Sequence, residues 1–120
     1  NILFKQLQKQ QATNNLQIIF VSVDPQRDSI NKLADYMDYF NSNFIAITGD
    51  DKEINKLARQ FGAAYFIEKG ETADNYLISH ASSIFLIDQN IKLIAAFSPP
   101  HKPDVLLDQY LSLGKLFDFN

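Results

Sequence analysis

The sequence predicts an α/β fold in which helices flank a mixed β-sheet, and three observations support that prediction. Segments with helical spacing alternate with short apolar segments in the first half of the chain. Residues 16–23 are almost continuously apolar, which is typical of a strand covered on both faces of a parallel sheet. Two later apolar segments, 82–88 and 91–97, have hairpin spacing, and their antiparallel pairing would make the sheet mixed.

Length and composition narrow the possible classes of protein. The 120 residues are 46% hydrophobic, which predicts a single domain with one core over residues 1–120. A net charge of −3 and scattered basic residues argue against a nucleic-acid partner. The chain contains no cysteine, so it supplies no thiolate ligand and no thiol nucleophile itself. No apolar segment approaches the roughly 18 residues that a membrane-spanning helix needs.

The first elements are predicted from apolar spacing and from residues that begin or end helices. Residues 1–11 are expected to form a helix, with two leucines four residues apart on one face. Residues 16–23 form the next strand, and an Asp-Pro pair ends it because proline cannot donate a ladder hydrogen bond. A second helix is expected to begin after Ser29 or Asp28, either of which is a suitable N-cap.

The middle of the chain continues this alternation. Residues 43–48 are predicted to form a strand, and Asp50 caps a third helix with a glutamate three residues later. Gly62 ends that helix, since glycine readily adopts the left-handed conformation of a C-terminal stop. Residues 63–68 and 75–79 are predicted to form a strand and its return strand across a polar turn.

The last elements are the hairpin and a C-terminal helix. Asn90 lies at the hairpin turn between residues 82–88 and 91–97, where asparagine tolerates a positive φ. A proline-rich loop follows, in which His101 is expected to be exposed, and apolar residues between 106 and 111 mark the helix. The helix that opens the chain has no strand before it, so we expect the first strand to lie upstream.

Several short motifs follow one another in a fixed order. They are V-D-P-x-R-D at residues 23–28, T-G at 48–49, F-G at 61–62, H-x-S at 80–82 and L-x-D at 86–88. In this order they resemble the Sco/SenC family, thioredoxin-like copper chaperones associated with assembly of cytochrome c oxidase. The resemblance covers nearly the whole chain and implies a thioredoxin-like fold.

The resemblance also implies a metal site that this chain does not complete. His80 matches the family's copper-binding histidine, and the family's other ligands are two cysteines in a C-x-x-x-C motif at the start of its first helix. That motif and the first strand are expected upstream of Asn1, so the chain would be truncated past the motif. Two thiolates and an imidazole suit Cu(I) or Cu(II). Without the thiolates, these 120 residues should bind copper weakly or not at all.

The acidic turn and the residue before the histidine are further candidates. Asp24 and Arg27 follow the predicted central strand, where sites form in α/β sheets, and Arg27 is expected to pair with Asp24 or Asp28. Either these residues only lock the turn, or they lie beside the copper site or on a partner surface. Ser79 stands where the family usually has aspartate, which would weaken the orientation of His80.

The resemblance implies a copper metallochaperone that delivers copper for cytochrome c oxidase assembly. Its partners would be the oxidase's copper-binding subunit and other copper chaperones. The intact protein would be membrane-tethered and face the periplasm or, in a eukaryote, the mitochondrial intermembrane space. Two alternatives remain open. One is an enzyme, a thiol-disulfide oxidoreductase, because a helix N-terminus lowers the pKa of a thiol. The other is a non-metal interaction domain, if the intact protein lacks the cysteines.

Overall fold

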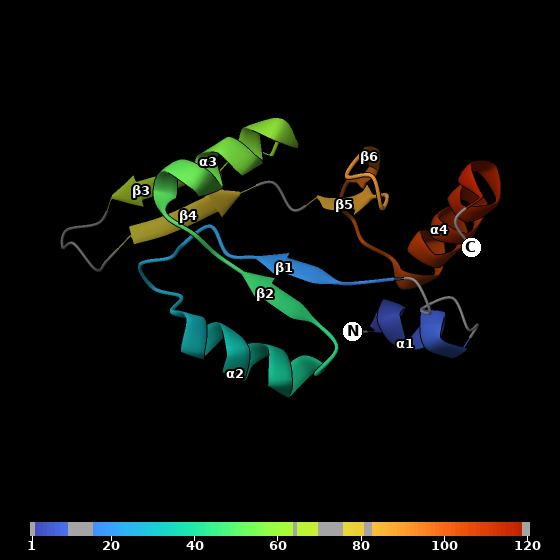
Figure 1. Cartoon of the computed structure of the whole chain (residues 1–120), viewed down its shortest axis with the longest axis horizontal. Helices are drawn as coiled ribbons and strands as arrows, with labels where there is room; N and C mark the ends of the chain where they lie inside the picture. Colours follow the sequence, from blue (N-terminus) through green and yellow to red (C-terminus); the bar gives the residue numbers. More distant parts are fainter. Residues whose placement is uncertain (1, 10–15, 64, 70–75, 81–82, 119–120) are drawn as a thin grey trace.

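The computed structural model describes residues 2–9, 16–63, 65–69, 76–80 and 83–118, and side chains for residues 5–9, 16–63 and 83–118. The helices are α1 (Ile2–Lys9), α2 (Ile30–Phe40), α3 (Asp51–Gln60) and α4 (Pro103–Phe117). The strands are β1 (Ile19–Val21), β2 (Ile45–Ile47), β3 (Tyr65–Lys69), β4 (Tyr76–His80), β5 (Ile84–Ile87) and β6 (Leu93–Phe97). This order of helices and strands is the predicted one (Figure 1).

β1 and β2 pair in parallel, with Ile19 opposite Ile45 and Val21 opposite Ile47. Both strands are shorter than the apolar segments 16–23 and 43–48 that predicted them. The apolar pattern records which residues avoid water, whereas the ladder extends only as far as both backbones run alongside each other.

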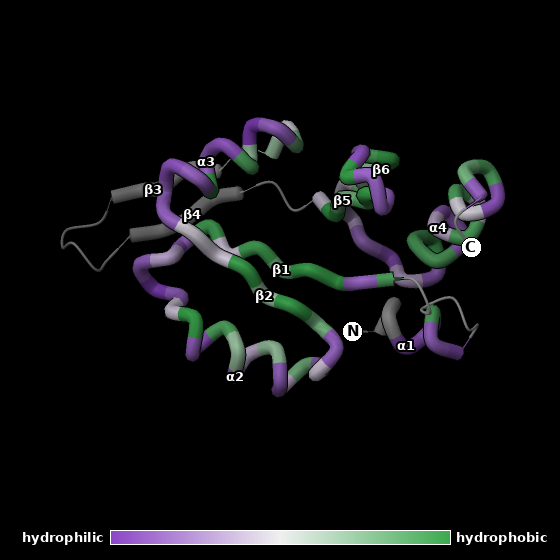
Figure 2. Tube along the Cα trace, in the orientation of Figure 1, coloured by the Kyte–Doolittle hydropathy of each residue, from purple (hydrophilic) through white to green (hydrophobic). Residues whose placement is uncertain are grey.

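One face of this parallel pair remains open to solvent, although we expected the first strand to be covered on both faces. Ile19, Ile45 and Ile47 are 54%, 46% and 43% exposed. Phe20 lies on the other face, where its ring centroid is 6.1 Å from that of Tyr36 on α2, although Phe20 itself is 43% exposed. Figure 2 shows β1 and β2 as a continuous hydrophobic pair, with α2 packed on one side. The prediction of a strand covered on both faces was therefore wrong for these residues.

The predicted helix ends are confirmed. Ser29 is the N-cap of α2, and its Oγ accepts a hydrogen bond from the Lys32 N–H at 3.2 Å. Asp50 is the N-cap of α3 and accepts from the Glu53 N–H at 2.9 Å. Gly62 follows α3 with a φ of 67°, a conformation that glycine adopts without strain.

The two predicted hairpins are present as antiparallel pairs. β3 pairs with β4, and β5 pairs with β6. Asp88 organises the second turn, because its Oδ1 accepts hydrogen bonds from the backbone N–H groups of Asn90 and Lys92 at 2.8 and 2.9 Å. The left-handed residue is Ile91, with a φ of 62°, rather than Asn90. The turn is thus one residue later than predicted.

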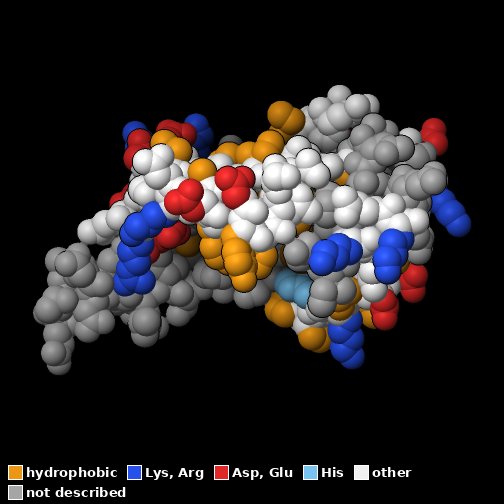
Figure 3. Space-filling view, turned by 90° about the horizontal axis from the view of Figure 1, so that it is seen from below, with side chains coloured by type: hydrophobic (Ala, Val, Ile, Leu, Met, Phe, Trp, Pro, Cys, Tyr) orange, Lys and Arg blue, Asp and Glu red, His pale blue; other side chains and the backbone are white. Residues whose placement is uncertain are grey.

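The described part of the chain buries only a small set of large apolar side chains. They are Leu7, Leu33, Met37, Ile54, Leu106 and Leu107. α1 packs against α4, and the Gln6 side-chain amide donates to Asp104 Oδ1 at 2.9 Å across this contact. The aromatic residues Tyr36, Tyr39 and Phe40 of α2 contact one another and are exposed. Figure 3, seen from below, shows hydrophobic side chains beside acidic ones on that face of the molecule.

The arrangement is more open than a closed domain of this length. The described strands form three separate two-stranded sheets rather than the one continuous sheet that the sequence suggested. The radius of gyration is 15.8 Å, whereas a compact domain of 120 residues is expected to measure about 13.6 Å. Among the described residues, no helix is long and apolar enough to cross a membrane. Parallel and antiparallel pairing nevertheless occur together, as predicted for a mixed α/β fold.

Candidate metal centre

The acidic turn that follows β1 is held by an internal ion pair. Arg27 Nε lies 3.5 Å from Asp24 Oδ2, and the Arg27 N–H donates to Asp24 Oδ1 at 3.3 Å. The Asp28 N–H donates to the Asp24 carbonyl oxygen at 2.9 Å, which closes the turn. The predicted pairing of Arg27 with Asp24 is confirmed, and it fixes the Asp24 carboxylate at the carboxyl end of a parallel strand.

Asp28 has a different partner, which the sequence reasoning missed. Ser22 is buried, with 2% of its surface exposed, and its Oγ donates to Asp28 Oδ2 at 2.5 Å. The same Oγ accepts a hydrogen bond from the Asp24 N–H at 3.2 Å. The signal was present in the sequence, since Ser22 is a lone hydroxyl in an apolar strand just before an acidic turn. A buried hydroxyl needs partners, and the turn supplies them.

Ser22 also connects the ends of the two parallel strands. Its N–H donates to the Ile47 carbonyl oxygen at 3.0 Å, and Thr48 Oγ1 donates to the Ser22 carbonyl oxygen at 3.4 Å. The turn after β1 and the residue after β2 are therefore held together at one edge of the pair. Loops fixed at this edge are the usual position of binding sites in α/β folds.

The structure places His80 and Ser79 by their backbone only. His80 is the last residue of β4 and pairs in register with Tyr65, and Ser79 pairs with Phe66. In Figure 1, β4 ends above the loop that leads from β1 to α2. The side chains of both residues, together with Ala81 and Ser82 of the H-x-S motif, lie outside the described residues, so their predicted roles stay predictions.

The second histidine is not the exposed loop residue that we expected. His101 is half-buried, and its Nε2 lies 2.9 Å from the Phe97 carbonyl oxygen. That contact attaches the proline-rich loop to the end of β6. On the helix that follows, burial raises the pKa of Tyr110 above its ordinary value.

The described side chains do not complete a metal site. In the ranges with described side chains, no three histidine, cysteine, aspartate or glutamate residues are grouped to hold an ion. The whole chain contains two histidines and no cysteine. The described residues therefore form an ordered polar edge near the ends of β1 and β2. The ligands of a metal ion would have to come from other residues.

The solved structures show the fold to which this arrangement corresponds. The copper-bound ScoI of Arabidopsis thaliana superposes with a TM-score of 0.79 and 26% identity, over 90% of this chain and 66% of that one. This match confirms the predicted thioredoxin-like α/β fold.

Sequence comparisons agree with the structural match. Protein SCO1 homolog 1, mitochondrial, from Arabidopsis thaliana is 29% identical over 90 residues, which are 75% of this chain and 27% of that protein. An SCO2-like protein of Rickettsia conorii is 31% identical over 91 residues, which are 75% of this chain and 44% of that protein. The chain thus spans less than half the length of these relatives. A family model described as SCO1/SenC matches residues 2–113, and the chain is therefore a member of the SCO1/SenC family.

Proposed function

We propose that the protein is a copper metallochaperone that delivers copper for cytochrome c oxidase assembly. The observation that carries this proposal is the superposition of 90% of the chain on a ScoI structure that contains copper. Copper is the cargo of such a protein, so its site must both bind the ion and release it to a recipient.

We propose that His80 is the ligand that this chain contributes. Imidazole binds both Cu(I) and Cu(II), and two thiolates from a C-x-x-x-C motif upstream of Asn1 would complete a three-coordinate site. Support comes from the position of His80 as the last residue of β4. A ligand at the end of a strand is less constrained than one inside it, which suits a site that must release its copper.

The domain itself is proposed to be larger than these 120 residues. The exposed faces of Ile19, Ile45 and Ile47 and the radius of gyration of 15.8 Å support an additional strand that packs here. The copper-bound ScoI chain is also longer, since this chain covers 66% of it. We infer that the first strand and the cysteine motif belong to that additional part.

Asp24, Arg27 and Ser79 are proposed to shape the surface around His80. The ion pair between Asp24 and Arg27 supports this role, because it fixes a carboxylate and a guanidinium at the strand edge. Ser79 is a weaker acceptor than the aspartate usual in the family, so His80 would be oriented less firmly and copper released more readily. The same surface would receive the copper-binding subunit of the oxidase or another copper chaperone.

The proposed location follows from the family. One relative is named mitochondrial, and others are bacterial. We propose that the intact protein is tethered to a membrane and faces the periplasm or the intermembrane space, where its oxidase partner would be accessible.

The test uses the full-length protein and the two histidines as a matched pair. Copper affinity would be measured by competition with a chromophoric chelator for the wild type, His80→Gln and His101→Gln. Glutamine at position 101 keeps a donor for the Phe97 carbonyl oxygen. We expect His80→Gln to lose at least tenfold in affinity and His101→Gln to retain it. Equal affinities in all three proteins would contradict a ligand role for His80.

The same proteins separate the chaperone from the oxidoreductase. Turnover of a disulfide substrate by the reduced dithiol would be measured in parallel with copper binding. A chaperone should bind copper through His80 and reduce disulfides slowly, whereas an oxidoreductase should turn over at a similar rate with and without His80. If the full-length protein has no cysteine pair, both functions are excluded together, and the non-metal interaction domain remains.

A further inference from the structure

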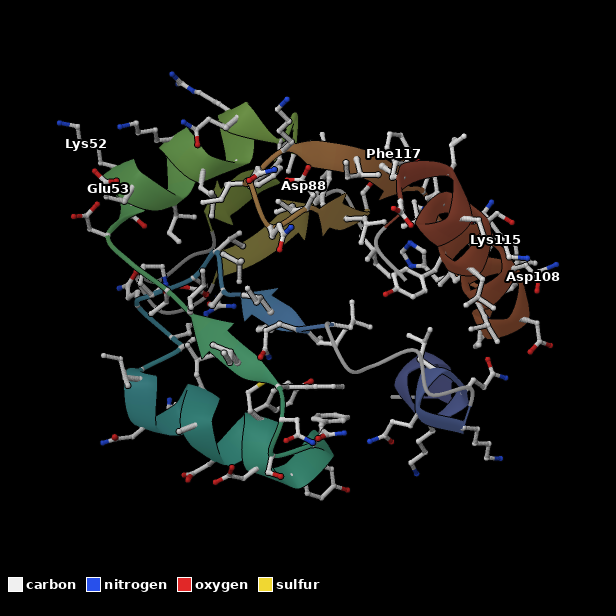
Figure 4. The ribbon with its side chains drawn as sticks, turned by 45° about the vertical axis from the view of Figure 1, so that its right-hand side comes forward. Lys52, Glu53, Asp88, Asp108, Lys115 and Phe117 are labelled. Atoms are coloured by element: carbon white, nitrogen blue, oxygen red, sulfur yellow. The ribbon has the colours of Figure 1, made fainter. Side chains whose placement is uncertain are left out.

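The outer face of α3 carries three cations. Lys52, Lys56 and Arg59 are spaced by four and three residues, so they share one side of the helix. Ile54, which is buried, marks the opposite side. All three cations are exposed, and none forms an ion pair with a carboxylate among the described residues. Figure 4 shows Lys52 extending away from the body of the protein at the start of α3.

A shallow hollow, open to solvent, lies among these cations. It has a volume of about 480 Å³ and is lined by Lys52, Lys56 and Arg59 together with the amide side chains of Asn55 and Gln60, all on α3. Cations and amides are hydrogen-bond donors, and the lining contains no acidic side chain. The chain as a whole has a net charge of −3, so this face reverses the sign of the protein's charge locally.

The spacing of the cations is unfavourable for the isolated helix. Lys52 and Lys56 are four residues apart, and Lys56 and Arg59 are three apart, so each pair brings like charges together. Glu53, three residues before Lys56, offsets this repulsion in part and only in the first half of the helix. The helix dipole accounts for Arg59 alone, because only that cation lies in the last turn. An anionic partner would relieve the repulsion along the whole face.

We propose that this face of α3 is a docking site for an acidic, extended segment of a partner protein. Along the helix axis Lys52 and Lys56 are about 6 Å apart. Alternate side chains of an extended chain are about 6.6 Å apart and lie on one side, so acidic residues at alternate positions match this spacing.

The composition of the face favours a protein segment over a lipid surface. A helix that lies on a membrane carries large apolar side chains beside its cations, and these insert between the lipids. The hollow is lined only by charged and amide side chains. Figure 2 likewise shows the visible side of α3 as mostly hydrophilic. The face therefore offers charge and hydrogen bonds but nothing to insert.

The test measures binding of a defined probe to the full-length protein without copper. The probe is an end-blocked, fluorescently labelled peptide of nine residues with glutamate at alternate positions and serine between them. Fluorescence anisotropy would be recorded at about 0.1 M salt, where charges more than about 10 Å apart are largely screened. A peptide with glutamine in place of glutamate shows whether the carboxylates are required.

The variants compare two sets of cations with equal change in net charge. The first carries Lys52→Gln, Lys56→Gln and Arg59→Gln, and the control carries Lys5→Gln, Lys92→Gln and Lys102→Gln. Glutamine has nearly the same helix propensity as lysine and arginine, so α3 should stay folded. We expect the first variant to bind the glutamate peptide at least tenfold more weakly than the wild type, and the control to change by less than twofold.

Three results would overturn the proposal. The first is equal affinity of the wild type for the glutamate and glutamine peptides. The second is a loss of affinity in the control variant as large as that in the α3 variant. The third is loss of binding to phosphatidylglycerol vesicles in the α3 variant with peptide binding intact, which would make a lipid surface the partner. Because the probe needs no copper, failure here is distinct from failure of the copper proposal.

Discussion

The two faces of the β1–β2 pair differ although their sequences are equally apolar. On one face α2 packs on the strands with its buried Leu33 and Met37 and leaves Phe20 partly exposed. On the other face Ile19 and Ile45 lie opposite each other and remain about half exposed. An apolar strand pattern therefore indicates which side chains need to be buried. Whether they are buried depends on whether another element of the chain packs on that face.

The largest effect is expected on the covered face. Leu33→Ala removes a buried side chain of α2. It should lower the free energy of unfolding by about 2–5 kcal/mol, because apolar burial is lost and a cavity remains. Urea denaturation followed by far-UV circular dichroism would measure it. Ile30→Ala on the same helix is the control, because Ile30 is 78% exposed and should cost little. Equal losses of unfolding free energy in the two variants would show that Leu33 is no better buried than Ile30.

The next largest effect is expected at the carboxyl ends of β1 and β2, where Ser22 lies. Ser22→Ala should lower the free energy of unfolding by about 1–3 kcal/mol, because Asp28 loses a donor and the Asp24 N–H loses an acceptor. Chemical denaturation of Ser22→Ala and of Ser42→Ala would be compared. Ser42 is exposed, so its variant should be as stable as the wild type. If Ser22→Ala is also as stable as the wild type, water must replace the lost hydroxyl.

A smaller effect on the free energy of unfolding is expected at the N-terminus of α2, the helix that packs on the strands. Ser29→Ala removes the N-cap of α2 and should cost about 1 kcal/mol, since the Lys32 N–H loses its partner. Ser29→Asp is the matched variant, because aspartate also caps a helix and should restore the stability. If thermal unfolding shows no difference between alanine and aspartate here, the cap contributes nothing to holding α2 on the sheet.

The smallest effect is expected on the open face. Ile19→Thr keeps a β-branched side chain and should change the free energy of unfolding of the 120-residue chain by only about 0.5 kcal/mol. In a longer protein that carries the proposed additional strand, the same substitution should cost several times more. Equal, small effects in both proteins would argue that nothing covers this face.

Much of the fold could be predicted because local rules determined it. Ser29, Asp50 and Gly62 begin or end helices by hydrogen bonds and backbone conformations that involve only near neighbours. The exact turn residue could not be predicted in the same way. Asp88 accepts two backbone hydrogen bonds across the turn, and that contact moves the left-handed position from Asn90 to Ile91.

The candidate site was predictable where it consisted of charged residues close together in the sequence. An ion pair of Arg27 with Asp24 or Asp28 was expected because all three lie in one short turn, and the structure shows the pair with Asp24. The role of Ser22 was missed because burial, which makes its hydroxyl important, arises only once β1 pairs with β2. Thr48 joins the network across 26 positions of sequence, and such a contact cannot be read from local spacing.

The packing of α1 on α4 has a consequence for how the protein is made. Gln6 and Asp104, which join these helices, are separated by 98 positions. At a synthesis rate of about 5–20 residues per second, the ribosome needs about 5–20 s to reach α4 after α1 has been made. For that interval α1, including Leu7, has no α4 to pack against. A nascent chain of this protein should therefore expose the apolar face of α1 to solvent until its last helix emerges.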